Sequence, residues 1–152
     1  MTAGRGELSG TSFFHETDAH DTASQRPRLL VVDDEPAICE LIGDVSRAAG
    51  YDVTRASERA DVDRLIGDPF DITVLDLDLG RLVVDDDVLR TLAMRRPGAR
   101  IVFVSGSDAG TVADAHRRAA TYGLRVLGSC QKPFDLTAFR RVLLRDDDLL
   151  RG

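Results

Sequence analysis

The chain has 152 residues, a length that fits one domain with a substantial core. It carries 20 basic and 26 acidic side chains, and this formal charge of −6 argues against nucleic acid held mainly through phosphate contacts. No apolar run approaches the ~20 residues of a membrane helix, and the first ten residues lack the pattern of a secretory signal. Cys39 and Cys130 lie far apart, which predicts reduced thiols in a cytoplasmic protein.

Residues 1–26 are rich in Gly, Ser, Thr and Asp and show no helical or strand periodicity. We therefore expect a disordered N-terminal extension. Phe13 and Phe14 are its apolar feature, and they leave open a second interpretation, in which the extension docks on a partner or back on the domain. The folded domain is placed at 27–147, followed by a short tail at 148–152.

From residue 27 onward, short apolar segments alternate with stretches of helical spacing. Strands are expected at 28–33, 51–55, 72–75, 101–104 and 124–131. Helices are expected at 36–49, 57–66, around 88–93, at 111–122 and from 136 onward. Ser57 and Asp135 are the predicted N-caps of the second and fifth helices. Buried strands that alternate with helices predict an α/β fold, a doubly wound parallel sheet of five strands with five helices on its two faces.

Polar side chains follow the ends of four predicted strands: Asp33 and Asp34 after the first, Asp76 after the third, Ser105 after the fourth and Lys132 after the fifth. Because the carboxyl ends of parallel strands share one edge of the sheet, these groups should converge. Lys132 is the only lysine beside 19 arginines. Clustered carboxylates repel each other, and a hard cation such as Mg²⁺ relieves the repulsion while accepting phosphate oxygens. The set suits phosphoryl chemistry at a carboxylate nucleophile.

In these segments the sequence resembles the response-regulator receiver domain of two-component signalling, over roughly 27–145. The resemblance rests on the motifs at 30–36, 71–77, 102–106 and 131–134, which read LVVDDEP, DITVLDL, VFVSG and QKPF. It implies a flavodoxin-like receiver fold with strand order 2-1-3-4-5, the order for which this family is a standard example. That order places the first and third strands, and so their aspartates, side by side.

The resemblance also implies residue roles. Asp76 accepts a phosphoryl group from a sensor histidine kinase or a phosphotransfer protein. Asp34, Asp76 and the backbone carbonyl of Asp78 ligate Mg²⁺, and Asp33 acts through water. Lys132 pairs with the phosphoryl group, and Ser105 is the switch hydroxyl. In addition, Gly106 leaves room beside Ser105, and Pro133 follows a cis peptide bond. Phosphorylation would then shift the packing of the helix 4–strand 5–helix 5 face.

Three departures from the family pattern are visible. Gly80 replaces the proline expected four residues after the acceptor, and the following loop carries Asp85 without the usual glycine. Ser129 stands where the switch aromatic is expected. Asp78 adds a carboxylate beside the acceptor, where it would repel a phosphoryl group or position water.

Few residues follow the last helix, so we expect a stand-alone receiver whose output is an unidentified partner protein, a homodimer or onward phosphoryl transfer. Two alternatives stay open. The departures suit a phosphorylation-independent binding module. The 75–78 segment, Leu-Asp-Leu-Asp, is similar to the nucleophile motif of haloacid-dehalogenase-type phosphatases, although that motif usually lies on the first strand.

Overall fold

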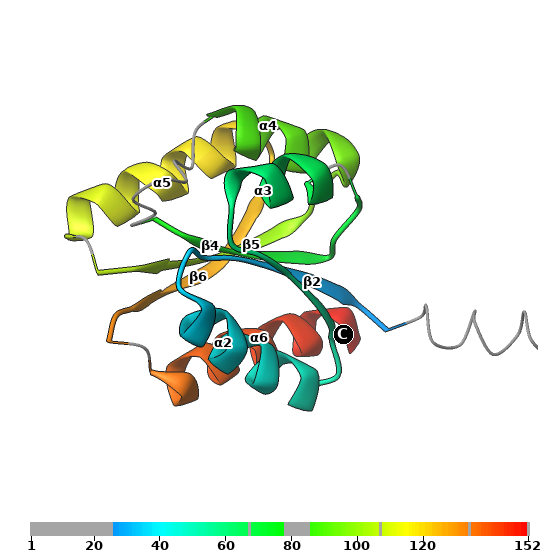
Figure 1. The fold of residues 1–152 in the computed structure, drawn as a ribbon. Coiled ribbons are helices and arrows are strands. Elements are labelled where there is room, and N and C mark those ends of the chain that lie inside the picture. Colours follow the sequence, from blue (N-terminus) through cyan, green and yellow to red (C-terminus); the bar gives the residue numbers. More distant parts are fainter. Residues whose placement is uncertain (1–25, 67, 78–85, 107, 134, 152) are drawn as a thin grey trace, which may run out of the picture.

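The computed structural model describes residues 26–66, 68–77, 86–106, 108–133 and 135–151. The extension at 1–25 and the loop containing Asp78, Gly80 and Asp85 lie outside the described residues. Elements are labelled as in Figure 1, where the first strand of the sheet is β2. The strands are β2 (Arg28–Val32), β3 (Asp52–Ala56), β4 (Ile72–Asp76), β5 (Arg100–Ser105) and β6 (Arg125–Gln131). The helices are α2 (Pro36–Ala48), α3 (Arg59–Leu65), α4 (Asp86–Arg95), α5 (Ala109–Thr121) and α6 (Leu136–Arg151).

The five strands form one parallel sheet in the order β3-β2-β4-β5-β6, which confirms the predicted order 2-1-3-4-5. Helices α3, α4 and α5 cover one face, and α2 and α6 cover the other (Figure 1). Alternate residues of each strand point to opposite faces, so β2 divides its side chains between two apolar cores. Leu30 and Val32 pack beneath α3, α4 and α5, whereas Leu29 and Val31 pack against α2 and α6.

The helix ends follow local chemistry. Asp135 caps α6 as predicted, since its Oδ1 accepts hydrogen bonds from the backbone N–H groups of Thr137 at 2.9 Å and Ala138 at 3.1 Å. Gly50 and Gly123, which follow the ends of α2 and α5, have φ values of 102° and 80°, a region that favours glycine.

The cap predicted for α3 is wrong. The helix starts at Arg59, and its N-cap is Glu58, which makes no side-chain capping bond. Ser57 instead donates its backbone N–H to Asp61 Oδ2 at 3.4 Å. The carboxylate in the first turn thus reaches back to the chain before the helix, which leaves the Ser57 hydroxyl without the capping role.

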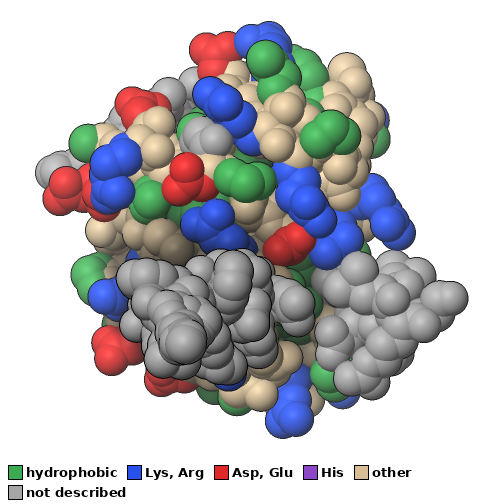
Figure 2. Space-filling view, turned by 90° about the vertical axis from the view of Figure 1, so that its right-hand side faces the viewer, with side chains coloured by type: hydrophobic (Ala, Val, Ile, Leu, Met, Phe, Trp, Pro, Cys, Tyr) green, Lys and Arg blue, Asp and Glu red, His purple; other side chains and the backbone are tan. Residues whose placement is uncertain are grey.

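The last helix, α6, continues to Arg151. Within the described part of the chain, no helix is long and apolar enough to cross a membrane. Figure 2 views the side on which the chain enters β2 and shows basic and acidic side chains interspersed across it. An interspersed surface of this kind lacks the single-sign field that draws a protein to a polyanion.

Candidate functional site

The sheet register brings the predicted strand-end residues together. Val32 of β2 pairs with Leu75 of β4. The next residues, Asp33 and Asp76, therefore lie side by side at the carboxyl ends of these strands. Ser105 closes β5 and pairs with Gln131 of β6. The backbone N–H of Lys132 donates to the Ser105 carbonyl at 3.0 Å, which holds the lysine at the same edge.

Lys132 is the centre of the cluster. Its Nζ lies 2.7 Å from Asp76 Oδ2, 3.2 Å from Glu35 Oε1 and 3.5 Å from Asp33 Oδ2. The side chains of Asp33 and Asp76 are each only 1% exposed, whereas that of Glu35 is 60% exposed. One ammonium group therefore faces three carboxylates, two of which have lost their water.

The pKa values reflect this imbalance. Burial raises the pKa of Asp33 to about 6, and the nearby charge of Asp76 adds to the rise, although a hydrogen bond from the Glu35 N–H and the charge of Lys132 oppose it. Burial lowers the pKa of Lys132. The hydrogen bond to Asp76 and the charges of Asp33 and Asp76 outweigh the effect of burial, so the pKa of Lys132 is raised overall. The lysine is thus held charged, and Asp33 titrates near pH 6.

The donor set fits a hard divalent cation. Asp33, Asp34, Glu35 and Asp76 each offer a carboxylate oxygen, and these oxygens lie within 4.8 Å of one another. Asp33 Oδ2 is buried and accepts no hydrogen bond from the described residues; the Lys132 ammonium at 3.5 Å is an ionic neighbour only. A buried carboxylate oxygen without a hydrogen-bond donor is suited to binding a cation.

Glu35 is a member of this cluster that the sequence reasoning missed. It follows the strand-end pair Asp33–Asp34 and precedes Pro36, the first residue of α2. Its position directly after two candidate ligands was the available signal. By contrast Asp78, predicted as a backbone ligand, lies outside the described residues.

The remaining predicted residues lie around this cluster. Ser105 is buried, and Gly106 follows it in an exposed bend. The Lys132–Pro133 peptide bond is cis, as the resemblance implies. Ser129 is exposed on β6 and pairs with Phe103 of β5, on the side of the site that faces α5.

Cys39 and Cys130 are both buried close to the site. Cys130 packs in the core beneath α2 and α6, as expected for a packing role. Cys39 Sγ donates to the Asp33 carbonyl at 3.2 Å, and burial raises the pKa of its thiol to about 11. The raised pKa keeps Cys39 protonated and poorly nucleophilic near neutral pH.

The structure resembles solved receiver domains over most of the chain. One match is a CheY-like response regulator receiver domain protein from Methanospirillum hungatei JF-1, with a TM-score of 0.66 and 20% identity, covering 84% of this chain and 100% of the other. Another is a response regulator from Colwellia psychrerythraea, with a TM-score of 0.65 and 24% identity, covering 82% and 98%. The chain has the receiver fold.

A third match adds a chemical observation about a relative of this fold. It is a response regulator protein from Burkholderia pseudomallei, solved with a phosphorylated aspartic acid, a calcium ion and citrate. Its TM-score is 0.62 and its identity 21%, and the alignment covers 83% of this chain and 75% of that one. No family model matches the sequence, and a search of curated proteins also gives no match. The receiver fold is therefore established by structure rather than by sequence similarity.

Proposed function

We propose that this protein is a response regulator in which Asp76 accepts a phosphoryl group with the help of Mg²⁺. The observation that carries the proposal is the ion pair of 2.7 Å between Lys132 and the buried Asp76, inside a cluster of four carboxyl groups. Stabilisation of the fold alone does not account for this cluster, because the buried Asp33 Oδ2 accepts no hydrogen bond from the described residues and a buried charge without a donor costs stability.

In the proposed reaction a carboxylate oxygen of Asp76 attacks the phosphorus atom of a phosphohistidine on a kinase or phosphotransfer protein. A P–O bond forms, the P–N bond breaks, and the released imidazole takes the bond's electron pair. The Lys132 ammonium lies beside Asp76 and would neutralise charge on the phosphoryl oxygens. Ser105, on the neighbouring strand end, is the hydroxyl that would donate to the transferred group.

Asp33, Asp34, Glu35 and Asp76 would hold the metal ion. When bound, Mg²⁺ supplies positive charge to phosphoryl oxygens and screens the carboxylates from one another. Asp33 would contribute its second oxygen, Oδ2, which accepts no hydrogen bond from the described residues. Under this proposal the phosphoryl donor is a sensor histidine kinase or a phosphotransfer protein. An output protein would contact the α5–β6–α6 face, and a second copy of the chain could use the same face to form a homodimer. The protein would act in the cytoplasm.

The test is phosphorylation by a small acyl-phosphate donor with Mg²⁺, read as added mass on the intact protein. Asp76→Asn should remain unmodified, and a chelator should prevent modification of the wild type. Asp71→Asn is the matched control, because Asp71 lies at the opposite end of the same strand. It should accept the phosphoryl group like the wild type.

Each other outcome points to a different function. A folded wild type that takes up no phosphoryl group contradicts the proposal and favours the phosphorylation-independent binding module, for which the exposed Ser129 is the motivating observation. Steady turnover of a generic phosphate ester would instead favour the phosphatase. Modification that persists in Asp76→Asn would mean that another residue accepts the phosphoryl group.

A further inference from the structure

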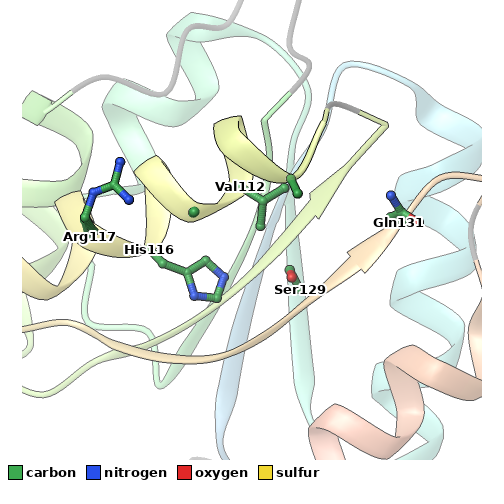
Figure 3. A pocket seen from close by; sticks show the side chains of 7 residues that line it. Val112, His116, Arg117, Ser129 and Gln131 are labelled. Carbon is green, nitrogen blue, oxygen red and sulfur yellow. The ribbon is translucent and has the colours of Figure 1, made fainter.

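A pocket of about 550 Å³ lies between α5 and the edge strand β6. Val112, His116 and Arg117 line it from the helix, and Ser129 and Gln131 line it from the strand (Figure 3). None of these residues takes part in the acidic cluster, although Ser105 of the neighbouring strand pairs with Gln131. The pocket is therefore a separate site next to the candidate phosphorylation site.

The pocket suits an aromatic side chain. Its volume is several times the ~150 Å³ that is known to hold a benzene molecule in a protein interior. The ring of His116 lies in the pocket wall and is backed by the buried ring of Phe103, with centroids 5.5 Å apart and planes at 36°. A further ring entering between α5 and β6 could stack or pack edge-on with that wall. The small side chain of Ser129 leaves the space open.

The chain itself offers an occupant. The described aromatic residues, Tyr51, Phe70, Phe103, Tyr122 and Phe139, are packed in or against the two cores. Phe13 and Phe14, by contrast, lie side by side in the N-terminal extension, outside the described residues. A phenylalanine side chain that enters the pocket removes apolar surface from water, which favours the docked position of a tethered segment.

The extension can reach the pocket. Arg26 lies twelve positions after Phe14, which gives a reach of about 40 Å when the chain is extended. Three strand spacings of about 4.8 Å separate β2 from β6, and a strand of this length rises about 20 Å, so the direct path is about 25 Å. The remaining length allows the segment to pass around the open edge of β6.

Charge favours the same contact. Between Gly6 and Gln25 the extension carries four acidic side chains and no lysine or arginine. Arg117 at the pocket is 71% exposed, and its partner is Asp114 on the same helix, at 3.3 Å. Exposed pairs of that kind are weak, so the guanidinium group can exchange Asp114 for a carboxylate of the arriving segment.

We infer that the Phe13–Phe14 segment docks in the α5–β6 pocket of its own chain, with Arg117 facing the acidic residues that follow. The docked segment would cover part of the face through which a receiver addresses its partner, and would so act as a built-in competitor for that face. The docking requires neither Mg²⁺ nor phosphorylation, so it stands or falls separately from the proposed function.

The test compares amide NMR spectra of the full-length wild type and the Phe13→Ala/Phe14→Ala double variant. We expect shift changes concentrated at residues 109–117 and 129–131, independent of protein concentration. Leu8→Ala in the same extension is the matched control and should leave those signals in place. Ser129→Phe fills the pocket from within, and it should move the amide signals of Phe13 and Phe14 to the positions of an unstructured peptide.

Three results would overturn the inference. Shift changes absent from the pocket, or centred elsewhere, would mean that the phenylalanines do not bind there. Changes that grow with protein concentration would assign the pocket to the extension of a second copy. Phe13 and Phe14 signals that are the same in the wild type and in Ser129→Phe would show that the pocket does not hold them, even if the double variant folds poorly.

Discussion

The two ends of β4 carry aspartates in opposite electrostatic surroundings. Asp71, just before the strand, has a separate donor for each oxygen: Arg96 lies 2.7 Å from Oδ1, and the backbone N–H of Arg28 donates to Oδ2 at 2.7 Å. Asp76, the last residue of the strand, shares the single ammonium of Lys132 with two further carboxylates. The amino end is neutralised, whereas the carboxyl end keeps an excess of negative charge.

This contrast separates structural from functional charge. A carboxylate with its own guanidinium and N–H donors stabilises the fold and has little left to offer a ligand. Beside the carboxyl end of the strand, the buried Asp33 Oδ2 accepts no hydrogen bond from the described residues, which costs stability, and binding of a cation would recover that cost. If the acidic cluster serves to bind a cation, substitutions at the two ends of β4 should have different effects.

The largest effect is expected at Lys132. Lys132→Ala should lower the rate of phosphorylation by a small acyl-phosphate donor by about 100-fold or more, because removal of a fixed charge beside a reacting group typically costs 10²–10³ in rate. The rate is measured by intact mass over time. Arg96→Ala, which removes the cation at the other end of β4, is the control and should react within about twofold of the wild type. Equal losses in both variants would contradict the distinction.

The second prediction concerns the free energy of unfolding. Asp71→Asn should lose about 1–3 kcal/mol, because it weakens two charge-assisted hydrogen bonds. Asp76→Asn should match or exceed the wild type by about 1 kcal/mol without metal, because it removes one of the crowded charges while the amide oxygen still accepts from Lys132. Urea titration at pH 7 measures both. A larger loss in Asp76→Asn than in Asp71→Asn would refute the prediction.

The third prediction is a pH dependence of Mg²⁺ binding. The pKa of Asp33 is raised to about 6, so below that pH the metal must displace a proton. The apparent affinity should be nearly constant above pH 7 and fall by up to tenfold per pH unit below 6. Calorimetry between pH 5 and 8 measures it. Asp33→Asn should bind more weakly and with a flatter pH profile, and an equally steep profile in that variant would point to another titrating group.

The smallest effect is expected at an exposed ion pair. Arg90 lies 2.7 Å from Asp87 on α4, but both side chains are more than half exposed. Asp87→Asn should therefore change the free energy of unfolding by less than about 0.5 kcal/mol. Urea titration beside Asp71→Asn makes the comparison direct, since both variants remove a carboxylate that lies 2.7 Å from an arginine. A loss as large as that of Asp71→Asn would mean that burial does not determine how much these ion pairs contribute to the free energy of unfolding.

Much of the fold was predictable because periodicity and strand ends are local properties. Buried β-branched runs identified the central strands, and the shared edge of a parallel sheet predicted that Asp33, Asp76, Ser105 and Lys132 would meet. Glu35 was not predicted, because it is exposed and joins the cluster only through the length of its side chain. The contact of Glu35 with Lys132 depends on how far the glutamate side chain extends, and not on a position at the end of a strand.

Other features depended on three-dimensional packing. His116 is half-buried against Phe103, and its spacing from Val112 and Ala119 places it on the inward side of α5. The pocket beside it depends on the volumes of side chains from two distant segments, which periodicity does not encode. The start of α3 depended on Asp61 reaching the Ser57 N–H, a competition that propensity alone does not resolve.

Lys132 is the one lysine of the chain, and its ammonium group lies between Glu35, Asp33 and Asp76. Reductive methylation with ¹³C-formaldehyde would therefore label only this amine and the α-amino terminus. The labelled methyl signal would follow the ionisation and occupancy of the acidic cluster directly, without mutation. A protein whose other cations are all arginines thus carries its own single-site spectroscopic reporter.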